Sequence, residues 1–373
     1  MPGGWRVERM AEMWVNMGPQ HPSTHGLWDL LVRVDGETIQ EAVTKIGYLH
    51  RGVEKIAENR TIEKFLPLND RLCYVANSSW TTLFVMTVEE LLEVTPPERA
   101  QYIRVVLLEL QRIASHLVWL GAYCSDMGLL TMLLWAWRDR ELVLDLLQFL
   151  TGARIMHNFP RVGGVRNDLP PTFKERALKV MDYLDERTKE YEMICSSSEL
   201  FRMRTEGIGV LPLEKAKDLG CTGPVLRASG LAQDVRKDDP YLVYERLDFK
   251  VPVGKRGDAW DRYTVRLEEI RQSASLVRQA LDKMPEGDFI IPNFKMPKAL
   301  PARAVYRRAE DPRGEGAMYL VGDGKTNRPY RLKIRSPTFV HLLSIPYYIK
   351  GAKISDAPVI MGGADPCMAE VDR

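Results

Sequence analysis

Apolar residues recur every three to four positions through five long stretches of the chain, and charged or polar residues fill the positions between them. This spacing places the apolar side chains on one face of an α-helix and predicts helices that bury that face. Several helices of this length in succession predict a helix bundle. The five stretches are residues 70–94, 97–126, 129–150, 172–200 and 257–284.

Shorter segments near both ends of the chain have the pattern of strands joined by Asp-Gly turns, a signal for hairpins. The paired segments are 27–34 with 38–46, around Asp35-Gly36, and 316–321 with 328–334, around Asp323-Gly324. Short helices are expected over 52–60 and 337–349. The predicted fold class is therefore mainly α (α+β): a long-helix bundle with a small N-terminal β-sheet and a C-terminal β-hairpin.

Residues 1–60 are expected to form a β-rich segment, and residues 61–373 the helix-bundle core with the hairpin, in one integrated domain. Two helix starts carry capping signals. Asn69 or Asp70 is the predicted N-cap of the first long helix, and Thr172 with Glu175 has the spacing of a capping box.

Two stretches rich in Gly and Pro, 161–171 and 207–257, interrupt the helices. Irregular segments of this length usually carry function or contact a partner. The longest uncharged run, residues 72–88, contains many Ser, Thr and Asn residues and is too short and polar for a membrane span, so a buried helix is expected there.

The charge balance argues against a nucleic-acid binder, because 52 basic and 50 acidic residues leave a net charge of only +2. The first 13 residues lack the apolar stretch of a secretory signal. The five cysteines contain no C-x-x-C pair, so neither a disulfide framework nor a local iron–sulfur or zinc site is expected, and a reducing cytoplasm is favoured. They are Cys73, Cys124, Cys195, Cys221 and Cys367.

The segment GPQHPSTHG, residues 18–26, is the most unusual stretch of the sequence. His21 and His25 lie four positions apart, but the two prolines forbid a regular helix, so the imidazoles need not share a face. Further ligands for zinc are missing nearby. From the residues alone, a functional histidine and an ordinary hydrogen-bonded turn both remain open.

This segment begins a resemblance that covers essentially the whole chain. With IGYLHRGVEK, LLELQRIASHLVWLG, TGAR, RVGGVRNDLP, LRASGLAQDVRK and the closing EVDR, it closely resembles the D-type subunit of NADH–quinone oxidoreductases, the respiratory complex I family. That family is similar in turn to the large subunit of nickel–iron hydrogenases. The resemblance implies a hydrogenase-large-subunit-like fold.

Hydrogenases hold nickel and iron with two pairs of cysteines, and this chain keeps half of them. Cys73 is followed three residues later by Ala76, and Cys367 is followed three residues later by Glu370. Because a nickel site needs a closed set of soft thiolates, no metal is expected here. Cys73 and Cys367 are interpreted as small buried apolar residues.

In the complex I family the emptied metal cavity serves as the quinone headgroup site, where a Tyr and a His donate to the quinone oxygens. The resemblance maps these donors onto Tyr74 and His25, and maps the carboxylate paired with that His onto Asp126. Positioned acids and hydrogen-bond donors suit quinone reduction, which takes up two electrons and two protons. The alternatives are a core tyrosine and a helix-end carboxylate, although the C-terminal end of a helix disfavours negative charge.

The resemblance also implies a 4Fe–4S cluster held by a neighbouring B-type subunit. Arg51 and His157 are the residues expected near that cluster, with a surface salt bridge as the alternative for Arg51. Ubiquinone-linked relatives have a histidine at the position of Met156, so a low-potential cluster and a menaquinone-type quinone are expected. His116 is interpreted as a core histidine in an apolar helix.

The expected partners are the B-type and C-type subunits and the membrane arm of a proton-translocating complex, with this chain peripheral on the cytoplasmic side of the cell membrane. NADH is the family's usual electron donor. Ferredoxin- or deazaflavin-linked relatives, a membrane-bound hydrogenase-like complex and a purely structural scaffold are the alternatives.

Overall fold

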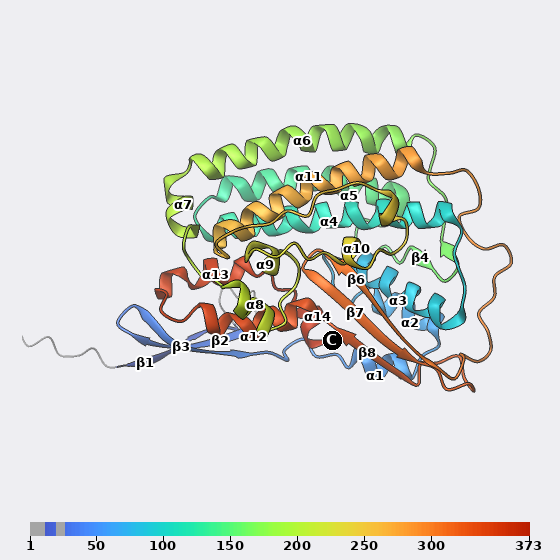
Figure 1. The fold of residues 1–373 in the computed structure, drawn as a ribbon, viewed down its shortest axis with the longest axis horizontal. Helices are drawn as coiled ribbons and strands as arrows, with labels where there is room; N and C mark the ends of the chain where they lie inside the picture. The colour runs from blue at the N-terminus through green and yellow to red at the C-terminus, as the bar shows by residue number, and fades with distance from the viewer. Residues whose placement is uncertain (1–11, 20–26) are drawn as a thin grey trace, which may run out of the picture.

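Four long helices pack around one another as a bundle, which forms one layer of the molecule (Figure 1). They are α4 (Glu98–Asp126), α5 (Leu130–Thr151), α6 (Phe173–Ser197) and α11 (Ala259–Lys283). The computed structural model describes residues 12–19 and 27–373. Within this layer α4 packs against α5 and α11, and α6 packs against α5 and α11. Four of the five predicted long helices therefore form the expected bundle.

The fifth long helix, α3 (Asn77–Leu92), packs mainly against a sheet rather than within the layer. Fourteen of its sixteen residues are buried, as expected for the uncharged stretch 72–88. By length and hydropathy α4 alone among the described helices passes the test for a membrane span, but 89 % of its apolar window is buried inside the structure. Such burial is that of a core helix.

The N-terminal sheet has three antiparallel strands in the order β1 (Met13–Met17), β2 (Asp29–Asp35) and β3 (Thr38–Lys45). The predicted hairpin is confirmed as β2–β3, and β1 adds an edge strand that was not predicted. Along β2 every second side chain is buried, at Leu30, Val32 and Val34, which is the period of a strand with one covered face. Helix α12 (Pro337–Tyr348) packs against β3.

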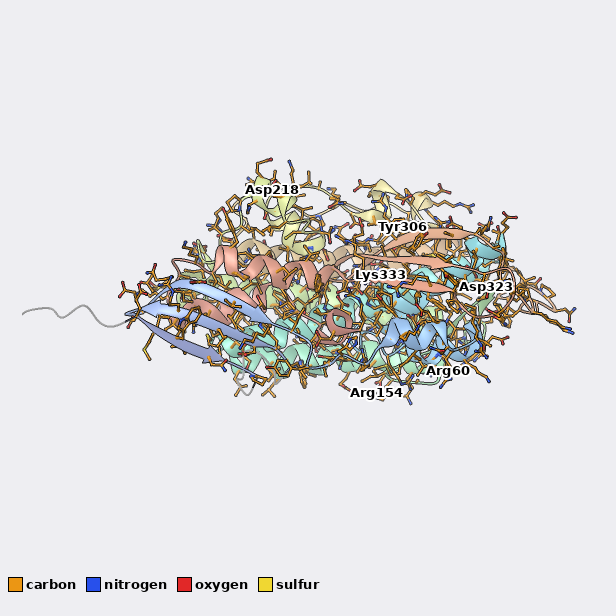
Figure 2. All side chains as sticks on the ribbon, turned by 90° about the horizontal axis from the view of Figure 1, so that it is seen from below. Arg60, Arg154, Asp218, Tyr306, Asp323 and Lys333 are labelled. Atoms are coloured by element: carbon orange, nitrogen blue, oxygen red, sulfur yellow. The ribbon has the colours of Figure 1, made fainter. Side chains whose placement is uncertain are left out.

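The C-terminal sheet is also antiparallel and three-stranded, in the order β6 (Ala304–Asp311), β7 (Gly314–Val321) and β8 (Arg331–Arg335). The predicted hairpin is confirmed as β7–β8, and β6 was not predicted. Strands β6 and β7 pack against α3. Seen from below, the N-terminal sheet extends at one end of the molecule, and Asp323, in the β7–β8 connection, lies toward the other end (Figure 2).

Short elements connect these parts, and most were not predicted individually. The helices are α1 (Val53–Glu58), α2 (Ile62–Asn69), α7 (Glu199–Thr205), α8 (Leu213–Asp218), α9 (Gly223–Ala228), α10 (Val235–Asp238), α13 (Ala357–Gly363) and α14 (Met368–Asp372). Two 3-10 turns, η2 (Tyr244–Arg246) and η3 (Ile354–Asp356), and a two-stranded ribbon, β4 (Pro160–Arg161) with β5 (Gly164–Val165), complete the fold.

The capping prediction for the first long helix is wrong, and the one for residues 172–200 is right only in the position of the N-cap, Thr172. Helix α3 begins at Asn77, and the Asp70 carboxylate instead accepts hydrogen bonds from Asn77 Nδ2 at 3.1 Å and Thr81 Oγ1 at 3.0 Å. Thr172 has a left-handed backbone, φ 65°, and makes no side-chain cap, while Glu175 binds Lys179 on the next turn. Asp70 makes tertiary hydrogen bonds, and Glu175 makes an i,i+4 ion pair, in place of the expected bonds to backbone amides at the helix starts.

The irregular stretch 207–257 is attached to the bundle by buried ion pairs. Arg227 binds Glu269 at 2.7 Å and Glu310 at 2.8 Å, and Arg236 binds Glu109 at 3.1 Å. All five side chains are almost completely buried. Buried charges are tolerated only when paired in this way, so these contacts fix the stretch onto α4 and α11.

Candidate functional site

A cavity of about 100 Å³ opens where the C-terminal half of α4, the start of β2 and the connections preceding α3 and α14 meet. Leucine, tryptophan, valine and methionine side chains supply apolar walls, and two phenols, two carboxylates and a guanidinium supply the charged and polar groups. The lining residues used below are Trp28, Tyr74, Trp119, Tyr123, Asp126, Arg313, Asp365 and Met368.

Tyr74 lies in the connection between α2 and α3, outside any helix. The amide of Gln111, on α4, donates to the carbonyl of Val75 at 2.7 Å and so fixes the backbone next to the tyrosine. Burial, together with the Cys367 and Cys73 thiols, raises the pKa of Tyr74 above its ordinary value. The phenol is therefore protonated at neutral pH, while 45 % of the residue's surface remains accessible.

Asp126 is the last residue of α4 and lines the same cavity as Tyr74. One turn earlier Tyr123 stacks on Trp119, with ring centroids 4.7 Å apart, and Trp119 Nε1 donates to the Gly362 carbonyl at 2.7 Å. These contacts fix the end of α4 against α13. The structure thus brings together two of the residues that the sequence singled out for quinone chemistry.

Arg313 and Asp365 also line the cavity, and sequence reasoning did not propose either as a site residue. Arg313 occupies the β6–β7 turn, and its Nη2 donates to Asp365 Oδ1 at 3.2 Å while its Nη1 donates to Ser115 Oγ at 3.1 Å. Asp365 has a left-handed backbone, φ 53°. The sequence signal for Arg313 was the Pro-Arg-Gly segment at 312–314. It would have been recognised as a hairpin turn if β6 had been predicted before it.

Several buried polar atoms of the lining residues have no hydrogen-bond partner within residues 12–19 and 27–373. They are Trp28 Nε1, Tyr123 Oη, Arg313 Nε and Asp365 Oδ2. Buried polar atoms in folded proteins are nearly always paired, so each of these atoms needs a partner beyond the described residues.

His25, the third residue predicted for this site, lies outside the described residues. Arg51 and His157, which were predicted to lie near a partner's cluster, are not among the residues that line the cavity. Arg51 donates to the carbonyls of Arg71 at 2.9 Å and Ala369 at 2.7 Å. His157 is buried, with its Nδ1 2.7 Å from Ser78 Oγ and its Nε2 3.2 Å from the carbonyl of Arg154.

Behind the Tyr74 backbone lies a buried group of two thiols and a carboxylate. Cys73 Sγ is 3.0 Å from Cys367 Sγ, and ligand atoms of Cys73, Cys367 and Glu370 all lie within 4.8 Å of one another. Glu370 accepts hydrogen bonds from Trp80 Nε1 at 3.1 Å, Ser336 Oγ at 3.0 Å and Thr338 Oγ1 at 2.6 Å.

Comparison with known proteins identifies the family to which the chain is similar. Residues 126–373 match the sequence model of the 49 kDa subunit of respiratory-chain NADH dehydrogenase, and residues 51–124 match that of nickel-dependent hydrogenases. The chain is 46 % identical to the D subunit of the NADH-quinone oxidoreductase of Desulforamulus reducens over 98 % of this chain and 99 % of that protein. It is 45 % identical to the D subunit of the F(420)H(2) dehydrogenase of Methanosarcina mazei, over 97 % and 98 %.

The chain belongs to the 49 kDa subunit family of respiratory-chain NADH dehydrogenases. Members such as the NADH-quinone oxidoreductase D subunit of Dehalococcoides mccartyi, at 45 % identity, are subunits of an oxidoreductase complex. The hydrogenase-like fold expected from the sequence is confirmed by the match over 51–124 and by the helical architecture.

The donor set does not fit the nickel centre of the hydrogenase relatives. Ala76 offers no ligand, and Glu370 is occupied by its three donors. Within the described part of the chain, this group is a thiol pair beside a hydrogen-bonded carboxylate rather than a metal cage.

Proposed function

We propose that this chain is the quinone-site subunit of a proton-translocating, NADH–quinone-oxidoreductase-like complex, and that the cavity beside Tyr74 takes the quinone headgroup. The observation that carries the proposal is the convergence of Tyr74, Asp126 and Arg313 on one cavity, in a chain of this family. Apolar walls with a few converging polar groups are typical of small-molecule sites.

The lining residues have the chemistry that quinone reduction needs. Reduction adds two electrons and two protons, and negative charge develops on the two ring oxygens. The Tyr74 phenol, whose raised pKa keeps it protonated, is the proposed donor to one oxygen. The proposed second donor is His25, with Asp126 as its carboxylate partner. Arg313 supplies a fixed positive charge that stabilises the developing anion.

Electrons are proposed to come from a 4Fe–4S cluster in a B-type partner subunit. Arg51 and His157 are the residues of this chain proposed to lie nearest to it. Burial lowers the pKa of His157, so this ring stays neutral near pH 7. With Met156 where ubiquinone-linked relatives have a histidine, the cluster potential is expected to be low and nearly independent of pH, as suits a menaquinone-type quinone. A redox titration of the cluster that gives a strong pH slope would contradict this.

The remaining partners are proposed to be a C-type subunit and the membrane arm of the complex. The chain is proposed to lie on the cytoplasmic side of the membrane. The electron donor is expected to bind other chains. Relatives named for NADH and for F(420)H(2) are similar to this chain to nearly the same degree, so either donor is compatible with this subunit. A ferredoxin-linked complex is a further alternative.

The experiment that tests the proposal is inhibitor-sensitive quinone reduction by membranes carrying Tyr74→Phe, with assembly of the complex checked on a native gel. Loss of one positioned donor is expected to cost about 2–4 kcal/mol of transition-state stabilisation, roughly a thirtyfold to thousandfold lower rate. The matched control is Tyr330→Phe, because Tyr330 is 70 % exposed and away from the cavity. Unchanged turnover of the assembled Tyr74→Phe complex would contradict the proposal.

A further inference from the structure

Cys73 and Cys367 are separated by 294 positions in the sequence, yet their sulfur atoms lie 3.0 Å apart. Both residues are in connections rather than inside helices: Cys73 precedes α3, and Cys367 immediately precedes α14. Connections can shift by small amounts without breaking a helical hydrogen-bond ladder. An S–S bond of about 2.05 Å could therefore form with a movement of about 1 Å.

A second set of contacts holds the same two segments together. The Arg51 guanidinium donates to the carbonyl of Leu72, directly before Cys73, at 3.5 Å, and to that of Ala369, two residues after Cys367, at 2.7 Å. It also donates to the carbonyl of Arg71 at 2.9 Å. Arg51 thus bridges the two backbones on either side of the thiol pair, and the contact between the sulfurs does not depend on the cysteines alone.

The thiol pair adjoins the proposed headgroup site through the backbone on both sides. Cys73 is followed by Tyr74 and Val75, and Cys367 lies between Pro366 and Met368. All four of these neighbours line the cavity. A covalent bond between the sulfurs would join the segment that carries Tyr74 directly to the segment that carries Pro366 and Met368.

The chain contains an internal comparison. Cys124 and Cys195 are also buried and near each other, with sulfurs 3.9 Å apart, but both lie inside long helices, α4 and α6. Like Cys73 and Cys367, neither lines the cavity itself, although Cys124 follows the lining residue Tyr123. Cys221 is buried as well, and among the described residues it pairs with no other cysteine. Among the five, only Cys73 and Cys367 combine a sulfur separation of 3.0 Å with positions in connections whose neighbouring residues line the cavity on both segments.

We propose that Cys73 and Cys367 form a redox-active pair, which a quinone-class oxidant in the cavity converts to a disulfide when no electrons arrive from the partner cluster. The inference rests on the proposed quinone site. Two S–H bonds break and one S–S bond forms. The two electrons and two protons released pass to the quinone, which leaves as the quinol.

Disulfide formation changes the site because Tyr74 is attached to one of the bonded residues. The oxidised pair ties Tyr74 to the segment that carries Asp365 and Met368, and the phenol can no longer move independently of that wall. Quinone reduction by the complex is expected to fall on oxidation and to return on reduction. Burial raises the pKa of Cys73, so this thiol stays protonated at neutral pH and is oxidised slowly.

The test uses the intact purified complex, incubated with duroquinone and no electron donor. Duroquinone has no free ring position for thiol addition, so it can only oxidise. Free thiols are then alkylated under denaturing conditions, and the peptides of this chain are analysed by mass spectrometry before and after dithiothreitol. We expect the Cys73 and Cys367 peptides to lose the label and to appear as one linked species, while the Cys124, Cys195 and Cys221 peptides keep it.

Activity provides the second readout. Duroquinone pretreatment is expected to lower quinone reduction reversibly in the wild-type complex and in Cys124→Ala. Cys73→Ala and Cys367→Ala should each remove this sensitivity. The two single variants are tested separately, so that the result does not depend on one variant that fails to assemble. Full labelling of all five cysteines after long incubation would overturn the proposal. Linkage without an effect on turnover would overturn the coupling to the cavity. A failure of Tyr74→Phe to change turnover would instead count against the quinone site, since the linked peptide is detected without any activity assay.

Discussion

Arg313, in the turn between β6 and β7, donates a hydrogen bond from Nη2 to Oδ1 of Asp365 at 3.2 Å. Asp365 lies in the connection between α13 and α14. The pair places a buried positive charge and its counterion beside Tyr74. Two roles follow from this arrangement. Arg313 can stabilise negative charge on the substrate, or it can merely neutralise Asp365.

Arg313→Gln is expected to lower the turnover of quinone reduction by about a hundredfold to a thousandfold, because one fixed charge is lost where charge develops. The double variant Arg313→Gln with Asp365→Asn separates the two roles, since it removes both charges together. Turnover and KM of the assembled complex are the measurements. If the double variant recovers wild-type turnover, Arg313 acts only as the counterion of Asp365.

Gly223→Ala is expected to destabilise the chain by several kcal/mol. An added Cβ would lie 2.3 Å from Gly314 Cα and 2.5 Å from the Arg313 carbonyl, at a residue with φ 64°. The left-handed backbone alone costs about 1–2 kcal/mol, and the clash with backbone atoms adds roughly 1–3 kcal/mol.

Gly207→Ala is the matched control for Gly223→Ala. Gly207 has φ 72°, but its added Cβ would meet no atom within 4 Å. It should therefore show only the cost of the left-handed backbone. Urea denaturation of the purified chain gives both free energies of unfolding, and equal losses would show that the turn bearing Arg313 is not tightly packed against α9.

Glu269→Gln is expected to destabilise the chain by about 3 kcal/mol, because it removes one of the two carboxylates closest to the buried Arg227 and leaves Glu310, at 2.8 Å, as the nearer partner. The neighbouring residue on α11 is a control of the same chemistry. Glu268 is 37 % exposed and pairs with Arg271 at the surface, so Glu268→Gln should cost less than about 1 kcal/mol. Similar urea midpoints for the two variants would contradict the importance of the buried network.

His341 should make the stability of the chain depend on pH. Burial and, secondarily, the Arg266 charge lower the pKa of His341 to about 3, and its Nε2 lies 3.0 Å from the Thr222 carbonyl. The unfolded value is about 6.5, so between these values the unfolded chain binds the proton and the folded chain does not. The contribution is therefore present above pH 6.5 and is lost as pH falls.

From pH 7 to pH 5 this single group should lower the free energy of unfolding by about 2 kcal/mol. His341→Gln removes the titrating group and keeps an N–H donor for the Thr222 carbonyl. Between pH 7 and pH 5, the free energy of unfolding of His341→Gln should fall by about 2 kcal/mol less than that of the wild-type chain. The same decline in both would assign the pH dependence to other groups.

Local pattern was sufficient for the long helices and both hairpins, but not for the ends of these elements or for most of the short ones. The long helices were identified by their apolar period, and both hairpins by their Asp-Gly turns. The start of α3 was misplaced because Asp70 is occupied by Asn77 and Thr81 rather than by backbone amides of a first turn. Strand β6 was missed because charged residues interrupt its alternation, and it forms only by pairing with β7.

The sequence by itself determined the class of fold, the family and two groups of the candidate site, Tyr74 and Asp126, because these depend on residue order and on motifs contiguous in the chain. Only the tertiary structure decided that Arg313 faces Asp365 and that Cys73 meets Cys367. Those pairs are 52 and 294 positions apart. Their contacts arise from the packing of separate elements around one cavity, and no local periodicity or spacing encodes such a distance.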